Sequence, residues 1–138
     1  MTRQTDIQNL AVATLKTAIG TTYPVKYPNL PFVTPSTPWL RLTVLPNQPL
    51  QVALGANGRD TITGIFQIDV LAPKGSGRNV SLGIIDSLCG GAFKSGLRYT
   101  ITGGEVKIRS AGLIATQEDT SWYQSVINVE FIAYLART

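Results

Sequence analysis

The stretch ALGANGRDTITGIFQIDVLAPKGSGRNVSLGIID spans residues 53–86 and decides the fold of this chain. Apolar and polar side chains alternate over residues 61–71, which is the period of a strand with one buried face. Pro73 ends this strand, and a Gly-rich turn follows it. Apolar residues then recur at helical spacing over residues 78–93. The stretch therefore predicts a strand, a tight turn and a helix in succession.

A Gly-rich turn between a strand and a helix can hold a phosphate on its backbone N–H groups. Here the turn reads G-S-G at residues 75–77. No Gly-Lys-[Ser/Thr] follows, as a P-loop requires, and Val80 stands where the dinucleotide fingerprint needs a third small residue. An ordinary strand-to-helix turn is the better interpretation. A small nucleotide-binding module, or a nucleic-acid-binding one, stays open as the alternative in another functional class.

On the N-terminal side, the apolar spacing predicts an amphipathic helix over residues 5–19, ended by Gly20. Prolines crowd residues 24–38, which forbids a helix there. This segment is interpreted as a stiff surface connector rather than as a ligand for a peptide-binding domain. Alternation over residues 39–45 then predicts a strand that ends at Pro46.

Residues 46–60 show no clean period and form the expected hairpin loop. A loop of about fifteen residues is long for a compact domain, and such loops are usually functional or disordered. Disordered segments are usually polar, whereas this one carries Leu50, Val52 and Leu54. Contact with a partner is therefore expected.

Toward the C-terminus, Val106, Ile108 and Leu113 predict a short hairpin with its turn around residues 110–112. A polar turn follows at residues 117–121. Residues 122–135 alternate most regularly of all and predict a long strand. No internal repeat appears, and the chain of 138 residues is expected to be one domain over residues 1–138.

The composition offers little to an enzyme. The chain has no histidine and a single cysteine, so the usual general base near neutral pH and the usual zinc ligands are missing. Cys89 lies on the buried stripe of its helix, and the carboxylates are spread over separate elements. No catalytic residue, metal site or cofactor is predicted. The net charge of +4 comes from scattered Lys and Arg, without the stripe typical of nucleic-acid binding.

Strand length indicates association. Fourteen residues of strand span roughly 46 Å, whereas sixteen residues of helix span only about 24 Å. Two helices cannot cover such strands within one subunit, so either the strands bend and twist sharply or a neighbouring subunit covers the overhang. Cover by a neighbouring subunit is the more economical interpretation. Charged residues make up only 14% of the chain, which suits a surface that neighbours cover. No apolar run approaches the ~20 residues of a membrane span, and no membrane partner is expected.

The order of elements resembles that of the tail terminator-like proteins of long-tailed bacteriophages. The matching segments are W-L-R-L-T-V, A-L-G-x-x-G-R, G-I-F-Q-I-D-V-L-A-P-x-G-x-G-R and the final S-W-Y strand. The resemblance implies a mixed sheet with helices packed on one face. With the elements above, this gives an α+β fold with a mixed, mostly antiparallel sheet of four to five strands, two helices on one face and a long hairpin loop.

The resemblance also implies a structural virion protein, a homohexameric ring that caps the head-proximal end of the tail tube. Such a ring stops tube polymerisation and provides the joint to the head connector. The implied partners are other copies of the chain, the tail tube protein and the connector or neck proteins, with DNA only passing through the ring. The implied location is the virion tail, after assembly in the host cytoplasm. A head-completion or neck protein under the portal is the alternative.

Seven residues are predicted to contact neighbouring subunits or the tube. Leu50, Val52, Leu54 and Arg59 belong to the hairpin loop, and Arg41, Lys74 and Arg78 would add charged contacts. The competing interpretation of each basic residue is an ordinary solvated surface charge, which contributes little energy.

Overall fold

The computed structural model describes residues 3–20, 22–27, 32–33, 35–46, 50–51, 59–75, 79–101, 104–118 and 122–136. Its elements, in chain order, are α1 (Arg3–Ile19), β1 (Val25–Lys26), β2 (Trp39–Pro46), β3 (Leu50–Gln51), β4 (Arg59–Pro73), α2 (Asn79–Ser87), the π-helix η1 (Leu88–Ala92), β5 (Arg98–Ile101), β6 (Gly104–Glu118) and β7 (Trp122–Ala136). They form an α+β fold, as predicted.

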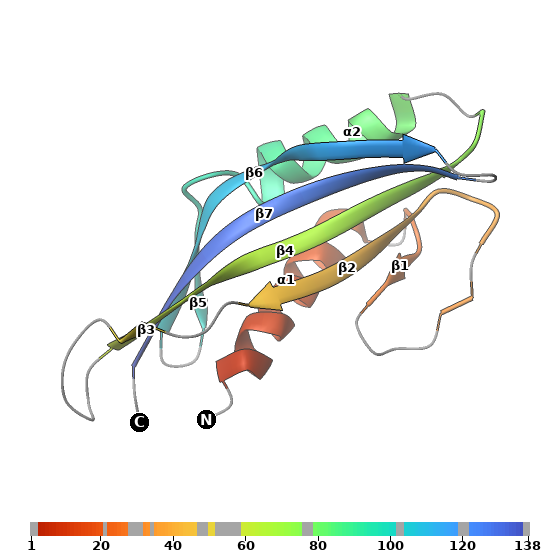
Figure 1. Cartoon of the computed structure of the whole chain (residues 1–138). Helices are drawn as coiled ribbons and strands as arrows, with labels where there is room; N and C mark the ends of the chain where they lie inside the picture. The colour runs from red at the N-terminus through yellow and green to blue at the C-terminus, as the bar shows by residue number, and fades with distance from the viewer. Residues whose placement is uncertain are drawn as a thin grey trace.

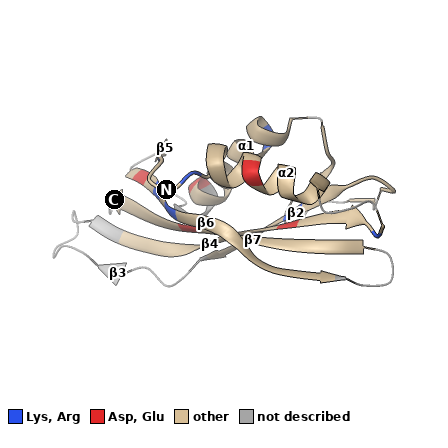
Figure 2. Cartoon of the chain, turned by 90° about the horizontal axis from the view of Figure 1, so that it is seen from above, with Lys and Arg blue, Asp and Glu red and all other residues tan. Residues whose placement is uncertain are grey.

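One curled sheet forms the body of the molecule (Figure 1). Among the described residues it has seven strands, more than the four to five expected, in the order β1-β2-β4-β7-β6-β5, with β3 paired to β4. Only β1 runs parallel to its neighbour, and the other pairs are antiparallel. The extra strands are β1, β3 and β5, each too short to give a period in the sequence. Both helices lie over the same face of the sheet (Figure 2).

The core lies between this face and the helices. Along α1, the fully buried Ile7, Ala11 and Leu15 are four residues apart, the spacing that puts side chains on one helical face. They meet the inward side chains of the sheet, including Phe66 and Phe131. The rings of Phe66 and Phe131 stack with centroids 4.4 Å apart. The predicted helix over residues 5–19 and its buried face are therefore confirmed.

Gly64 in β4 allows this stacking. A Cβ atom at Gly64 would lie 2.7 Å from the Leu45 carbonyl oxygen and 2.8 Å from Cζ of Phe131. Glycine inside a strand weakens the strand unless another group approaches closely. Here the ring of Phe131 lies across the position that a side chain would fill.

Three long strands carry the sheet. Each of β4, β6 and β7 has 15 residues, or roughly 50 Å at about 3.3 Å per residue. The strands predicted over residues 39–45, 61–71 and 122–135 are confirmed and are extended by one or two residues at their ends. The predicted helix over residues 78–93 is shorter: α2 begins at Asn79, and η1 replaces its last turns, where Gly90 and Gly91 weaken α-helical geometry.

The hairpin predicted around residues 110–112 is wrong. β6 continues through these residues and pairs with β7 over its whole length. Register shifts at Arg109 and Ile114, which have no partner residue in β7, interrupt its period. Such bulges insert one residue and change which face later side chains occupy. β6 forms a hairpin with the short β5, which precedes it, and not with the residues after 112 as predicted.

The expected hairpin loop also differs where it is described. β3 pairs Leu50 with Thr61 and Gln51 with Asp60, and β4 begins at Arg59. The rest of the loop, including Val52 and Leu54, lies outside the described residues, as does Arg78.

Candidate assembly surface

The outer face of the sheet, opposite the helices, carries the alternate side chains of β2, β4, β7 and β6. At one end lies an aromatic cluster of Phe32, Trp39 and Trp122. The centroid of the Trp39 ring lies 5.0 Å from that of Phe32 and 6.1 Å from that of Trp122. Trp39 is 6% exposed although it faces away from the helices. The cluster forms a second, smaller apolar centre on the outer face.

An ion pair lies next to this cluster. Arg41 of β2 donates from Nε and Nη2 to one carboxylate oxygen of Asp69 in β4, at 2.8 and 2.6 Å. Gln67 donates to the other oxygen at 3.2 Å. The Asp69 side chain is 1% exposed and the Arg41 side chain 37%. A buried carboxylate needs such partners because removing it from water is costly, so Arg41 is engaged within its own chain.

Four of the seven predicted contact residues, Arg41, Leu50, Arg59 and Lys74, belong to the described part of the chain, and these four do not form one patch. Arg41 lies on the outer face next to the aromatic cluster, and exposed Lys74 follows the end of β4 on the same side of the molecule. The backbones of Leu50 and Arg59 lie at the other end, where β3 and the start of β4 meet. Since β4 spans roughly 50 Å, the two groups lie at opposite ends of the molecule.

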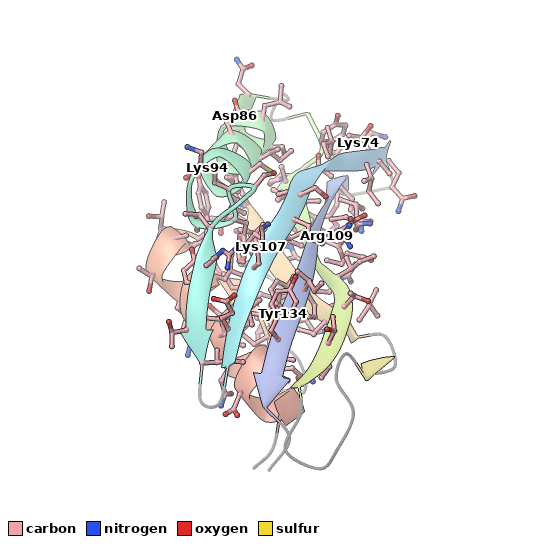
Figure 3. All side chains as sticks on the ribbon, turned by 90° about the vertical axis from the view of Figure 1, so that its left-hand side faces the viewer. Lys74, Asp86, Lys94, Lys107, Arg109 and Tyr134 are labelled. Atoms are coloured by element: carbon pink, nitrogen blue, oxygen red, sulfur yellow. The ribbon has the colours of Figure 1, made fainter. Side chains whose placement is uncertain are left out.

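Figure 3 shows the charged side chains at the other edge of the sheet. Lys107 and Arg109 belong to β6 and Tyr134 to β7, while Asp86 belongs to α2 and Lys94 follows η1. Arg98 of β5 pairs with Glu105 of β6 at 2.9 Å. These groups are exposed or half-buried, so they are ordinary surface charges in the isolated subunit.

Exposed apolar side chains mark surface that the sequence analysis missed. Leu45 on β2 is 47% exposed, and Leu113 and Ile114 on β6 are 42% and 59% exposed. The signal was present: Leu113 and Ile114 are adjacent apolar residues that break the alternation of a half-buried strand. In the sequence analysis, Leu113 belongs instead to the short hairpin with its turn around residues 110–112, and Ile114 has no predicted role.

Cavities lie beside α1 in the described part of the chain. One of about 320 Å³ lies between the end of α1 and the start of α2, and Ile19, Tyr23, Val80 and Ile84 contribute to its wall. Among the described residues, no group of three or more His, Cys, Asp or Glu could hold a metal ion. Within the same residues, none of the helices has the length and apolar character needed to cross a membrane.

Cys89 packs against the core at the start of η1 and is half-buried. Burial, and to a smaller extent the nearby Asp86 carboxylate, raises the pKa of the Cys89 thiol. The reactive thiolate is therefore scarce near neutral pH. This agrees with the interpretation of Cys89 as a packing residue.

Comparison with known proteins identifies the family. A family model described as phage tail terminator protein matches residues 6–131, which is most of the chain. The chain belongs to the phage tail terminator protein family. The chain is therefore a structural protein of the phage tail. The match also confirms the resemblance to tail terminators that the sequence analysis found.

Structural comparison agrees with the fold of this tail terminator family member. One solved protein without a descriptive name is similar at a TM-score of 0.71 and 21% sequence identity. The alignment covers 91% of this chain and 94% of the other. At this identity the likeness concerns the fold alone. No curated protein matches the chain in sequence.

Proposed function

We propose that this protein is a tail terminator that forms a ring of six copies on the head-proximal end of the tail tube. The ring stops addition of further tube subunits and provides the joint to the head connector. The observation that carries the proposal is the match of the tail terminator family to residues 6–131. The protein acts by contact and not by catalysis.

The geometry supports an assembled state. The strands of 15 residues extend beyond the helical layer, whose longest helix, α1, has 17 residues and spans only about 26 Å. The side chains of Leu113 and Ile114, in the far half of β6, are exposed in the isolated subunit. Exposed apolar patches on a soluble protein commonly mark interaction surface, and a neighbouring copy would cover this one.

The two ends of the molecule then have different roles in the proposal. Leu50 and Arg59, whose backbones lie at one end, contact the tube or a neighbouring copy in this proposal, together with Val52 and Leu54 of the same loop. Lys74, which follows the end of β4 at the other end, contacts a neighbour or the connector, together with Arg78 of the same turn. Such partners place the protein in the virion tail after assembly in the host cytoplasm, with DNA passing through the ring.

Tail length tests the proposal. A phage whose gene for this chain carries a nonsense codon should make tubes of irregular, excessive length that do not join heads. Wild-type chain supplied in trans should restore both properties, measured by electron microscopy. Tails of normal length that join heads would refute the proposal. Recovery of the protein on isolated heads instead of free tails would indicate the neck role.

The hairpin loop has a separate test. A chain carrying Leu54→Asp and Arg59→Asp should fold, as judged by circular dichroism, but lose length control. A chain carrying Lys16→Ser, an exposed change on α1, is the matched control and should behave as wild type. Normal tails from the loop variant would show that the loop is not the contact, without affecting the terminator role itself.

A further inference from the structure

The outer half of β6 is an open sheet edge. β5 pairs with β6 up to Lys107. The residues just before β5 cover one residue more: the Ile108 N–H donates to the Leu97 carbonyl at 2.8 Å, and the Ile108 carbonyl accepts from Gly96 at 2.7 Å. Within the described residues, β6 beyond Ile108 pairs with β7 alone. Residues 109–117 are all exposed or half-buried. Their outward N–H and C=O groups can therefore accept another strand.

β2 forms a second open edge on the opposite side of the sheet. β1 pairs with Leu40 and Arg41 only. In the described part of the chain, residues 42–45 pair with β4 and with no other strand. The two open stretches differ in sequence and lie on opposite edges, so contact between them in two copies is heterologous.

A row of the sheet consists of the residues that lie opposite one another on neighbouring strands. The two open stretches occupy the same rows and therefore lie at the same height along the strand direction. The central row consists of Val44, Phe66, Val129 and Ala111. The rows beside it follow the same rule, so each residue of 42–45 shares a row with one residue of 110–113. We name residues 42–45 the β2 edge segment and residues 110–113 the β6 edge segment. Copies related by rotation within a ring keep the same height, so these two segments can meet.

The hydrogen-bonding groups of the β2 edge segment point outward at alternate residues. The N–H of Leu40 donates to the Pro24 carbonyl, beyond the sheet edge of β2, at 3.0 Å. In an antiparallel ladder every second residue directs its N–H and C=O to the same side. Leu42 and Val44 therefore direct theirs to the open edge.

The β6 edge segment has the matching phase. Ile108 directs its N–H and C=O away from β7, and its partner there is Phe131. Since β7 keeps strict alternation past the bulge, Ala111 and Leu113 also direct theirs away from β7. In the shared rows, Ala111 stands with Val44 and Leu113 with Leu42. When two copies meet at the same height, the outward-facing N–H and C=O groups of the two segments therefore lie opposite each other.

The two bulges delimit the same window. Arg109 is the extra residue just after β5 ends, and Ile114 is the extra residue just after the β6 edge segment. In a neighbouring copy, the row after this segment is the one in which β1 begins to cover β2 at Arg41. Bulges bend a strand and end regular pairing. In the proposed contact, the bulge at Arg109 bends β6 where β5 ends. The bulge at Ile114 bends β6 where β1 of the neighbouring copy begins to cover the edge of β2.

The β6 edge also lacks the side chains that protect open edges. Natural sheets block edge pairing with charged residues and prolines, yet residues 110–117 contain neither. On the β2 side, Leu45 is exposed by 47%. In a shared row it would lie beside Ser110, and Leu113 would lie beside Leu42 of the neighbour. Both exposed leucines would lose water on pairing.

We propose that the β6 edge segment of one copy pairs with the β2 edge segment of the next, so that one sheet continues around the ring. β2 and β6 run in opposite directions within a subunit, so rotation about an axis near the strand direction makes the pairing antiparallel. This inference rests on the proposed ring. The partner it assigns is a second copy of this chain, and the paired strands set the angle and height of the contact.

Engineered disulfides test the register. In a Cys89→Ala background, Thr43→Cys and Gly112→Cys stand in the same row, and a Cβ at Gly112 meets nothing within 4 Å. Assembled tails carrying both changes should give a ladder of cross-linked chains on non-reducing gels after oxidation. The matched control combines Thr43→Cys with Gln117→Cys on the same edge but in a distant row, and it should give no ladder.

The other outcomes of the disulfide test overturn the pairing, with or without the proposed function. No ladder from Thr43→Cys with Gly112→Cys, in tails whose rings are visible by electron microscopy, overturns the pairing and leaves the proposed function intact. Dimers from Gly112→Cys alone would show that β6 pairs with itself, which also overturns it. Tails of normal length that lack this protein overturn the proposed function and the pairing together.

A proline pair gives a second readout that does not depend on cysteine chemistry. Ala111→Pro removes an N–H that faces the open edge and leaves the ladder to β7 intact. The ring, measured by native mass or electron microscopy, should be lost. Thr116→Pro removes another edge-facing N–H outside the β6 edge segment and should keep the ring. Equal effects of the two prolines on rings formed by folded chains would overturn the pairing.

Discussion

The two faces of the sheet, which the same strands form, differ in how far their side chains are buried. On the helix-facing side of β4 and β7, Phe66, Ile127 and Phe131 are at most 1% exposed and form a continuous core. On the outer side fewer side chains are buried: Trp39, Leu71 and Asp69 lie near one end and Thr61 near the other. One face therefore fixes the fold, and the other leaves most of its side chains available for contact.

Phe66→Ala breaks the covered face and should have the largest effect. The ring of Phe66 stacks on Phe131 and lies against Phe93, and its loss leaves a cavity. We expect a decrease of about 3–5 kcal/mol in the free energy of unfolding, measured by urea denaturation. Thr43→Ala on the outer side of the adjacent strand β2 is the control. Equal losses from the two variants would contradict the division between the faces.

Arg41→Leu breaks the buried ion pair on the outer face. Asp69 would lose two hydrogen bonds from a charged donor while staying buried. We expect a decrease of about 1–3 kcal/mol, at the lower end because the Arg41 side chain is partly exposed. The double variant with Asp69→Leu removes the unpaired buried carboxylate and should recover part of the lost free energy of unfolding. A double variant as unstable as the single one would contradict this account.

Leu45→Thr tests the open part of the outer face and should have the smallest effect on the isolated subunit. The side chain is 47% exposed, so the free energy of unfolding should change by no more than about 0.5 kcal/mol. Leu42→Thr, on the same strand but 2% exposed, is the control and should cost clearly more. A large effect of Leu45→Thr on thermal unfolding of monomers would show that this face is also part of the core.

The alternation of apolar side chains was sufficient to predict the strands that face the core. It identified β2, β4 and β7 and their inward residues, and helical spacing identified α1. It failed for β6, because the bulges at Arg109 and Ile114 change the phase, and for β1, β3 and β5, which have too few residues to show a period.

The surface was less predictable for a different reason. That Arg41 binds Asp69 depends on the register between β2 and β4, across a separation of 28 residues, and spacing in the sequence does not reveal it. The open edges likewise depend on where β1 and β5 end relative to their neighbours. Whether the predicted contact residues at the two ends bind partners stays a prediction.

The central position of the last strand has a consequence for how the chain folds. β7 pairs with β4 from Arg59↔Ala136 to Pro73↔Trp122, so the middle of the sheet joins segments distant in sequence. Such non-local pairing slows folding, because a long loop must close before the contacts form. The sheet cannot close until the C-terminal strand has left the ribosome, and β4 must wait for it. A nascent chain stalled before residue 122 should therefore remain bound by chaperones, whereas the released chain should not.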